Sequence, residues 1–267
     1  MILKVLMDNN TYIDRYYLGE PAVSYYIEDG STKILFDMGC SDAFMLNAEK
    51  MGIDLTRVDI IVLSHGHDDH TKGLKYYRDW KKEITLVAHP DCFNRKEDET
   101  GLFIGSPLSK EELMEKCTLQ LSDKPVKISE NIYFLGEIPV AYDFEKRKPI
   151  GKTIIRNRKE DDFLKDDSAM VYKSSEGLFI ITGCSHSGIC NIIEYAKKVC
   201  GDDRVLGVIG GFHLFERDEQ LFSTIEYFKD NSLRLLYPCH CVSLEAKIEM
   251  GKELDVREVG VGLELEI

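Results

Sequence analysis

The feature that most constrains this chain is a dense histidine and aspartate motif that follows an apolar run. Residues 60–63 read IIVL and residues 65–70 read HGHDDH. The apolar run predicts a short buried strand that delivers the polar motif at its C-terminal end. Imidazole nitrogens and carboxylate oxygens at this density suit zinc, iron or manganese, and they suffice for two ions. Because α/β sheets bind ligands at the C-terminal ends of their strands, a metal site is favoured over a histidine-rich surface loop.

Length and charge narrow the classes of protein that the chain can represent. It has 267 residues, of which 43% are hydrophobic, so it can bury a substantial core and is not expected to be disordered. The formal net charge of −13 argues against broad binding to nucleic acid or to an anionic membrane, because both need a basic surface. A small phosphorylated substrate remains compatible with this charge, since a few local cations suffice to bind it.

The N-terminus and the cysteines bear on the cellular compartment. Residues 1–6 (MILKVL) are short and contain a lysine, so they predict a first strand rather than an export signal. No apolar run approaches the roughly 20 residues of a membrane helix. Without an export signal, the eight cysteines are expected to be reduced thiols. These features predict a cytoplasmic protein that does not bind membranes.

Three later segments place a histidine directly after an apolar strand. They are residues 178–182 before GCSHSG, residues 205–209 before GGFH, and residues 233–237 before PCHC. Folding does not require histidine at strand ends, whereas strand ends that converge on one edge build a site. We therefore expect His186, His213 and His240 to meet the 65–70 motif. His89, after a predicted strand, is expected to be structural or to face substrate.

Two segments outside this pattern carry further expectations. Residues 91–125 are irregular and predict a lid or pocket wall, in which Arg95 and Lys96 are candidate contacts for an anionic substrate. Residues 141–167 are highly charged and predict an exposed excursion rather than a domain linker. Helices are predicted over residues 42–51, 74–81, 109–117, 189–199, 218–229 and 243–250.

The HGHDDH motif and the strand before it resemble the H-x-H-x-D-H signature of the metallo-β-lactamase superfamily. The resemblance implies an α/β fold, a four-layer αββα sandwich of two mixed β-sheets flanked by helices. It also implies that residues 1–267 form a single domain with two divalent metal ions, zinc first, with iron or manganese as alternatives. A bridging water or hydroxide would then be the nucleophile.

The same resemblance assigns roles to individual residues. One ion would be held by His65, His67 and His186, and the other by Asp69, His70 and His240. Asp69 and His213 would have catalytic roles, and Asp37 and Asp68 would orient a ligand or the water.

One position departs from the usual pattern of the superfamily, in which a Gly-Asp pair follows the later strand and the aspartate bridges the metals. Here the strand is followed by Gly183 and Cys184. A thiolate ligand at Cys184 would shift metal preference towards iron or redox chemistry. The alternative is a buried thiol that binds no metal.

The GCSHSG, GGFH and PCHC motifs, with GSPL at residues 105–108, resemble a narrower branch of the superfamily, similar to 7,8-dihydropterin-6-methyl-4-(β-D-ribofuranosyl)aminobenzene 5′-phosphate synthase. The resemblance implies a hydrolase of a small ester or phosphoester, with His213 near a substrate phosphate. A first alternative is a transferase that joins a dihydropterin to a ribofuranosylaminobenzene phosphate. A second is a non-catalytic protein with a structural zinc held by Cys184, His186, Cys239, His240 and Cys241.

Overall fold

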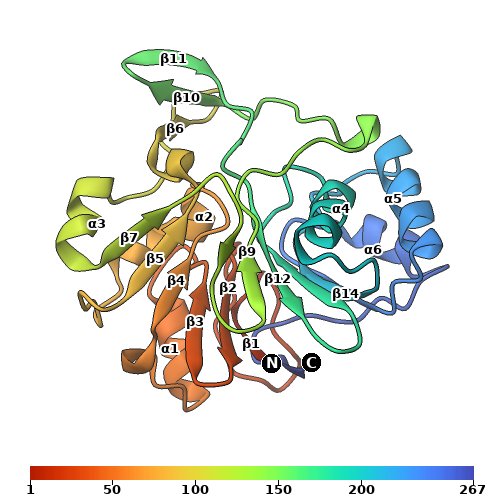
Figure 1. Ribbon diagram of the computed structural model, residues 1–267, viewed down its shortest axis with the longest axis horizontal. Helices are drawn as coiled ribbons and strands as arrows, with labels where there is room; N and C mark the ends of the chain where they lie inside the picture. Colours follow the sequence, from red (N-terminus) through yellow and green to blue (C-terminus); the bar gives the residue numbers. More distant parts are fainter.

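Two mixed β-sheets face each other in the computed structural model, which describes residues 1–267, and helices cover their outer faces (Figure 1). The two chain ends lie close together at one edge of the molecule (Figure 1). This is the four-layer αββα sandwich, so the predicted fold class is confirmed.

The first sheet has seven strands. In spatial order they are β16 (Glu264–Glu266), β1 (Ile2–Met7), β2 (Ser24–Asp29), β3 (Thr32–Phe36), β4 (Ile60–Val62), β5 (Thr85–Ala88) and β7 (Thr118–Leu121). Strands β3, β4, β5 and β7 run parallel to one another, and the other neighbours are antiparallel.

The second sheet has six strands, and a third sheet has three. The six are β15 (Leu235–Pro238), β14 (Val205–Gly210), β13 (Leu178–Thr182), β12 (Ala169–Lys173), β9 (Ile132–Phe134) and β8 (Val126–Lys127), and the three are β11 (Arg158–Asp161), β10 (Lys152–Ile155) and β6 (Arg95–Glu97). Strands β13, β14 and β15 are parallel. Their C-terminal ends therefore lie at one edge, as the sequence predicts.

Six α-helices complete the fold: α1 (Ala43–Lys50), α2 (Asp68–Thr71), α3 (Lys110–Lys116), α4 (Ile189–Cys200), α5 (Glu219–Asp230) and α6 (Leu244–Met250). Three of them begin at a side-chain cap: Ser109, Asp218 and Ser243 each accept a hydrogen bond from a backbone N–H in the first turn of α3, α5 and α6. None of the helices combines the length and apolar character that crossing a membrane requires.

The core is divided by the alternation of side chains along each strand. In β13, Phe179 and Ile181 point into the layer between the two sheets, whereas Leu178 and Ile180 point towards the helices. Leu3 and Val5 of β1 enter the same central layer. This alternation holds the two sheets face to face and fixes which strand ends are neighbours.

Two expectations from the sequence are wrong. No helix covers residues 74–81, since α2 is short and gives way to a 3₁₀ turn at Lys72–Lys75. Gly73 donates to the carbonyl of Gly39, and a Cβ there would lie 1.9 Å from the oxygen of Met38, so the chain packs at this point against the segment that follows β3. Residues 141–167 are not simply an exposed excursion. They contain the β10–β11 hairpin and four buried carboxylates, at Glu145, Asp162, Asp166 and Asp167.

Candidate metal centre

Three histidines from two loops form the first group, which we call cluster one: His65, His67 and His186. The loop after β4 supplies His65 and His67, and the loop between β13 and α4 supplies His186. Ligand atoms of the three lie within 4.8 Å of one another. Their ring centroids are 4.7 to 5.2 Å apart. Chain segments more than 100 residues apart thus place three imidazoles around one point.

Four ring nitrogen atoms of cluster one are buried without a hydrogen-bond partner. They are Nε2 of His65, Nε2 of His67 and both ring nitrogens of His186. Leaving buried polar atoms unpaired costs free energy, so such atoms indicate a missing ligand. Burial also lowers the pKa of all three histidines, which keeps the imidazoles neutral and their lone pairs available. The donor set fits a zinc-like ion.

Four residues form the second group, cluster two: Asp69, His70, Cys184 and His240, whose ligand atoms also lie within 4.8 Å of one another. The Nε2 atom of His70 is 3.1 Å from the sulfur of Cys184 and 3.5 Å from Oδ2 of Asp69. The Nε2 atom of His240 is 3.2 Å from the same Asp69 oxygen. These donors fit zinc or iron better than manganese, because they include a thiol.

Cluster two differs from cluster one in charge. Burial alone would lower the pKa of His70, but the carboxylates of Asp69 and Asp37 outweigh it and raise this pKa well above its usual range. Burial would raise the pKa of Asp69, yet His70 and His240 hold it well below its usual range. An ion that binds here would therefore replace a proton on His70.

Asp37 orients the ring of His70. It directly follows β3 and has a positive φ of 53°. Its Oδ2 lies 2.6 Å from Nδ1 of His70, and its Oδ1 accepts the N–H of Ser64 at 2.7 Å. A ring held at Nδ1 presents Nε2 to a metal, so the geometry matches the orienting role that the resemblance implies.

His240 is held in the same way by a region that the sequence reasoning missed. Its Nδ1 lies 3.0 Å from Oδ1 of Asn9, and its backbone N–H donates to Asp8 at 3.0 Å. The available signal was the polar DNN run that follows the first strand. As with His70, engagement of Nδ1 directs Nε2 towards the centre of the cluster.

His213 lies beside cluster one rather than in either cluster. Its ring centroid is 4.5 Å from that of His186, and both residues line a cavity of about 390 Å³. Burial lowers the pKa of His213 to about 4, so its imidazole is neutral near pH 7. Lys146, Lys148 and Phe215 also line this cavity.

The other predicted site residues lie elsewhere. Asp68 pairs with Lys72 on the surface of α2, with Oδ2 at 3.4 Å from Nζ. Arg95 pairs with Glu97 at 2.9 Å and is largely exposed. Lys96, the other candidate contact for an anionic substrate, has its ammonium buried between the carboxylates of Asp162 and Asp166.

The five residues of the structural-zinc alternative do not converge. His186 belongs to cluster one, whereas Cys184 and His240 belong to cluster two. The sulfur of Cys239 lies 3.2 Å from the hydroxyl of Tyr25, in the layer between the sheets. The sulfur of Cys241 contacts the backbone oxygen of Cys184 at 3.4 Å. A closed site built from these five is therefore not supported.

Comparison with known proteins decides the family. The model described as "Metallo-beta-lactamase superfamily" matches residues 18–197. The chain belongs to this superfamily. Within it, the 7,8-dihydropterin-6-methyl-4-(beta-D-ribofuranosyl)-aminobenzene-5'-phosphate synthase of Methanocaldococcus jannaschii is 32% identical over 246 residues, which are 86% of this chain and 84% of the synthase. An uncharacterized protein of the same organism is 31% identical over 255 residues, 94% of each chain.

A solved structure supports the same assignment. Tm1679, described as a metal-dependent hydrolase of the beta-lactamase superfamily, superposes with a TM-score of 0.85 at 27% identity, covering 100% of this chain and 99% of that one. The resemblance inferred from the sequence motifs is thereby confirmed, both for the superfamily and for the narrower branch.

Proposed function

We propose that this chain is a two-metal hydrolase that acts on a small ester or phosphoester in the cytoplasm. The observation that carries the proposal is the pair of adjacent ligand clusters, one of which has buried nitrogen atoms with no partner in the protein. Cluster one would hold one ion. Asp69, His70 and His240 would hold the other, with Cys184 as a further ligand.

Two divalent ions held in these clusters would polarise a substrate oxygen and supply a nucleophile at neutral pH. The residues of the chain contribute orientation. Asp37 and Asn9 hold the Nδ1 sides of His70 and His240, and Ser64 Oγ lies 3.0 Å from Nδ1 of His65. Hydrogen bonds at Nδ1 hold each ring so that its Nε2 faces the metal position. This lowers the free energy needed to order the ligands when an ion binds.

The cavity beside cluster one supports a small anionic substrate. Lys146 and Lys148 line it and are exposed, so they are the candidate contacts for a phosphate or carboxylate in a cavity that Glu216 and Asp218 also line. His213 faces the same cavity as a neutral imidazole and would donate a hydrogen bond to a substrate oxygen. The net charge of −13 disfavours nucleic acid as the substrate.

The second candidate function is a pterin-pathway synthase. It is favoured by the relative named as the dihydropterin synthase, which is 32% identical and matches 86% of this chain. In that reaction the amine of a ribofuranosylaminobenzene phosphate would displace a leaving group from the 6-methyl carbon of a dihydropterin and lose a proton. The same centre would then activate one of two organic substrates rather than water.

One experiment separates the two functions. The purified metal-loaded protein is incubated with a panel of phosphate monoesters, phosphate diesters and lactones, and in parallel with a ribofuranosylaminobenzene phosphate and a dihydropterin that carries a leaving group on its 6-methyl carbon. Mass spectrometry detects either a product that has gained water or a joined adduct. The hydrolase proposal predicts metal-dependent hydrolysis of at least one ester, reduced in the His213→Gln variant. An adduct without hydrolysis of any ester would overturn it in favour of the synthase.

A further inference from the structure

Three aspartates between β11 and β12 are buried although their segment is rich in charge. Asp162, Asp166 and Asp167 are 5%, 1% and 0% exposed. Burying a carboxylate is costly unless each oxygen finds a partner, so their contacts indicate why this segment is folded inward. The contacts lead to the two loops that carry cluster one.

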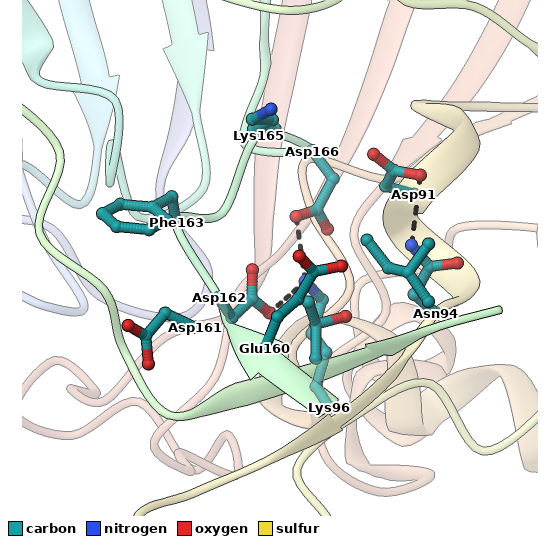
Figure 2. Close-up of a pocket in the computed structure, with 11 residues that line it drawn as sticks. Asp91, Asn94, Lys96, Glu160, Asp161, Asp162, Phe163, Lys165 and Asp166 are labelled. Atoms are coloured by element: carbon teal, nitrogen blue, oxygen red, sulfur yellow. Dashed lines mark hydrogen bonds and ion pairs between the residues drawn. The ribbon is translucent and has the colours of Figure 1, made fainter. Parts of the chain in front are cut away.

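Asp166 connects the first of these loops to a buried cation. Its Oδ2 accepts the backbone N–H of Gly66 at 2.8 Å, and its Oδ1 lies 2.9 Å from Nζ of Lys96. The same ammonium lies 2.7 Å from Asp162, so one lysine compensates two carboxylates, as Figure 2 shows. Gly66 stands between His65 and His67, and Asp166 therefore holds the backbone that carries both.

Asp167, the next residue, holds the second loop. Its Oδ2 accepts the backbone N–H of Ser187 at 2.8 Å, and its backbone oxygen accepts the Ser187 hydroxyl at 3.1 Å. Ser187 directly follows His186. Two consecutive aspartates thus bind the backbone of the two separate loops that supply the ligands of cluster one.

Neighbouring contacts leave the first loop little freedom. The N–H of Ser168 donates to the carbonyl of Ser64 at 2.9 Å, immediately before His65. A Cβ added to Gly66 would lie 2.0 Å from the backbone oxygen of Cys92 and 2.9 Å from Cε of Lys96. The loop is therefore clamped between Asp166 on one side and the Cys92 backbone on the other.

We propose that Asp166 and Asp167 are paired positioning residues, which set the separation of the two histidine loops so that His65, His67 and His186 converge on one ion. The inference rests on the proposed metal centre and goes beyond it, because neither aspartate belongs to a ligand cluster. Residues that orient metal ligands typically contribute 10- to 100-fold to metal affinity.

The two aspartates differ in a way that makes the test sharp. Both oxygens of Asp166 accept from donors, the Gly66 N–H and the Lys96 ammonium. In Asp166→Asn the single oxygen should keep the stronger charge-assisted bond to Lys96, which places the NH2 group against the Gly66 N–H and breaks that contact, while Lys96 also keeps Asp162 as a partner. Asp167 uses one side-chain oxygen, and its Oδ1 has no partner. Asp167→Asn can therefore keep the bond to Ser187, whereas Asp167→Ala cannot. Asp161→Asn is the matched control, because Asp161 lines the cavity of Figure 2 but its carboxylate pairs with Lys152 near the surface.

The experiment is a titration of the full-length metal-free protein with Co²⁺. Visible absorption counts all bound cobalt, and a thiolate-to-cobalt charge-transfer band reports the cluster that contains Cys184. Asp166→Asn and Asp167→Ala should lower the affinity of cluster one for cobalt, the ion that gives no charge-transfer band, by about 10- to 100-fold. Asp167→Asn and Asp161→Asn should stay within about threefold of wild type, and the cobalt with the charge-transfer band should be unchanged in all four.

Each other outcome has a separate meaning. If the wild-type protein bound no cobalt, the proposed function itself would fail. If the wild type bound two ions and Asp166→Asn bound both as tightly as Asp161→Asn does, the positioning role would be refuted while the metal centre survived. An equal loss of affinity for both ions, together with a lower melting temperature of the metal-free protein, would show that the two aspartates contribute only to general stability. This result would also refute the positioning role. If Asp166→Asn fails to fold, the comparison of Asp167→Ala with Asp167→Asn decides alone.

Discussion

Cluster one and cluster two lie side by side but are built from different chemistry. The ring centroids of His65 and His70, one from each cluster, are 4.3 Å apart. Cluster one has three neutral imidazoles whose inward nitrogens have no partner. Cluster two has a carboxylate, a thiol and two imidazoles that interact with one another. The difference therefore comes from the residues themselves and not from depth in the protein.

The comparison separates two ways of preparing a metal site. The buried, unpaired nitrogens of cluster one gain their first partner when an ion binds. In cluster two an ion must replace the proton of His70, which two carboxylates stabilise. We therefore expect cluster two to lose its ion first on acidification, because metal ligands must be deprotonated.

The largest effect should come from removing a ligand of cluster one. His186→Ala leaves two imidazoles there, and a site with two protein ligands holds an ion weakly. We expect metal content to fall by one ion per chain and hydrolytic kcat/KM to fall on the order of 10³-fold or more, since a metal ion contributes several kcal/mol. Elemental analysis and kinetics check this. His213→Gln is the matched control and should keep both ions while reducing the rate less.

A smaller effect should follow when the partner of a cluster-two ligand is changed. Asp37→Asn replaces the charged group that holds Nδ1 of His70. We expect the affinity of cluster two to fall about 10- to 100-fold while cluster one is unchanged. Titration of the metal-free variant with Co²⁺ distinguishes the two, because only cluster two contains a cysteine. Loss at cluster one instead would show that the clusters are not independent.

The metal-free protein should show opposite pH dependence for the two clusters. Burial lowers the pKa of His65 below its usual value of 6.5, so its stabilising contribution is present above about pH 6.5 and is lost as the pH falls. The pKa of His70 is raised, so its contribution is full below about pH 6.5 and is lost as the pH rises through its folded value. Urea unfolding between about pH 5 and pH 8 measures both. Relative to wild type, His65→Gln should lose less stability on acidification and His70→Gln should lose more. Identical profiles for the two variants would contradict the contrast.

The smallest effect is expected at Asp68, which lies within the motif but pairs with Lys72 near the surface. Exposed pairs of this kind contribute about 0.3–0.5 kcal/mol. Asp68→Ala should therefore change the free energy of unfolding by no more than about 0.5 kcal/mol and leave the metal content unchanged. Denaturant unfolding and elemental analysis test this, and a lost ion would instead give Asp68 the orienting role that the resemblance implies.

Much of the site could be predicted because its residues follow a local sequence pattern, an apolar strand followed by a histidine. Apolar runs that end in histidine identified β4, β13, β14 and β15, and the parallel arrangement of the last three brings His186, His213 and His240 to one edge. The grouping of ligands followed from the resemblance to the superfamily, and the structure brings the same residues together. Asp37 followed from the same source.

The rest depends on contacts between distant segments, which no local pattern encodes. Lys96 was interpreted as a contact for substrate. Its two carboxylate partners lie 66 and 70 residues further along the chain, so the sequence near Lys96 does not reveal them. The charged segment that contains Asp166 and Asp167 was interpreted as exposed, because high charge normally indicates solvent. Its burial follows from N–H groups at Gly66 and Ser187 that become available only once both loops are folded. The same reason explains why Asn9 was missed as a partner of His240.

We propose that the chain holds two metal ions in two distinct clusters. The most direct measurement is elemental analysis of protein purified without added metal, for wild type and for a variant with both Asp69→Ala and His70→Ala. We expect two ions of zinc, iron or manganese per chain in the wild type and one in the variant. A single tightly held zinc in both proteins would contradict the proposal, because the 65–70 motif would then not be part of a two-metal centre.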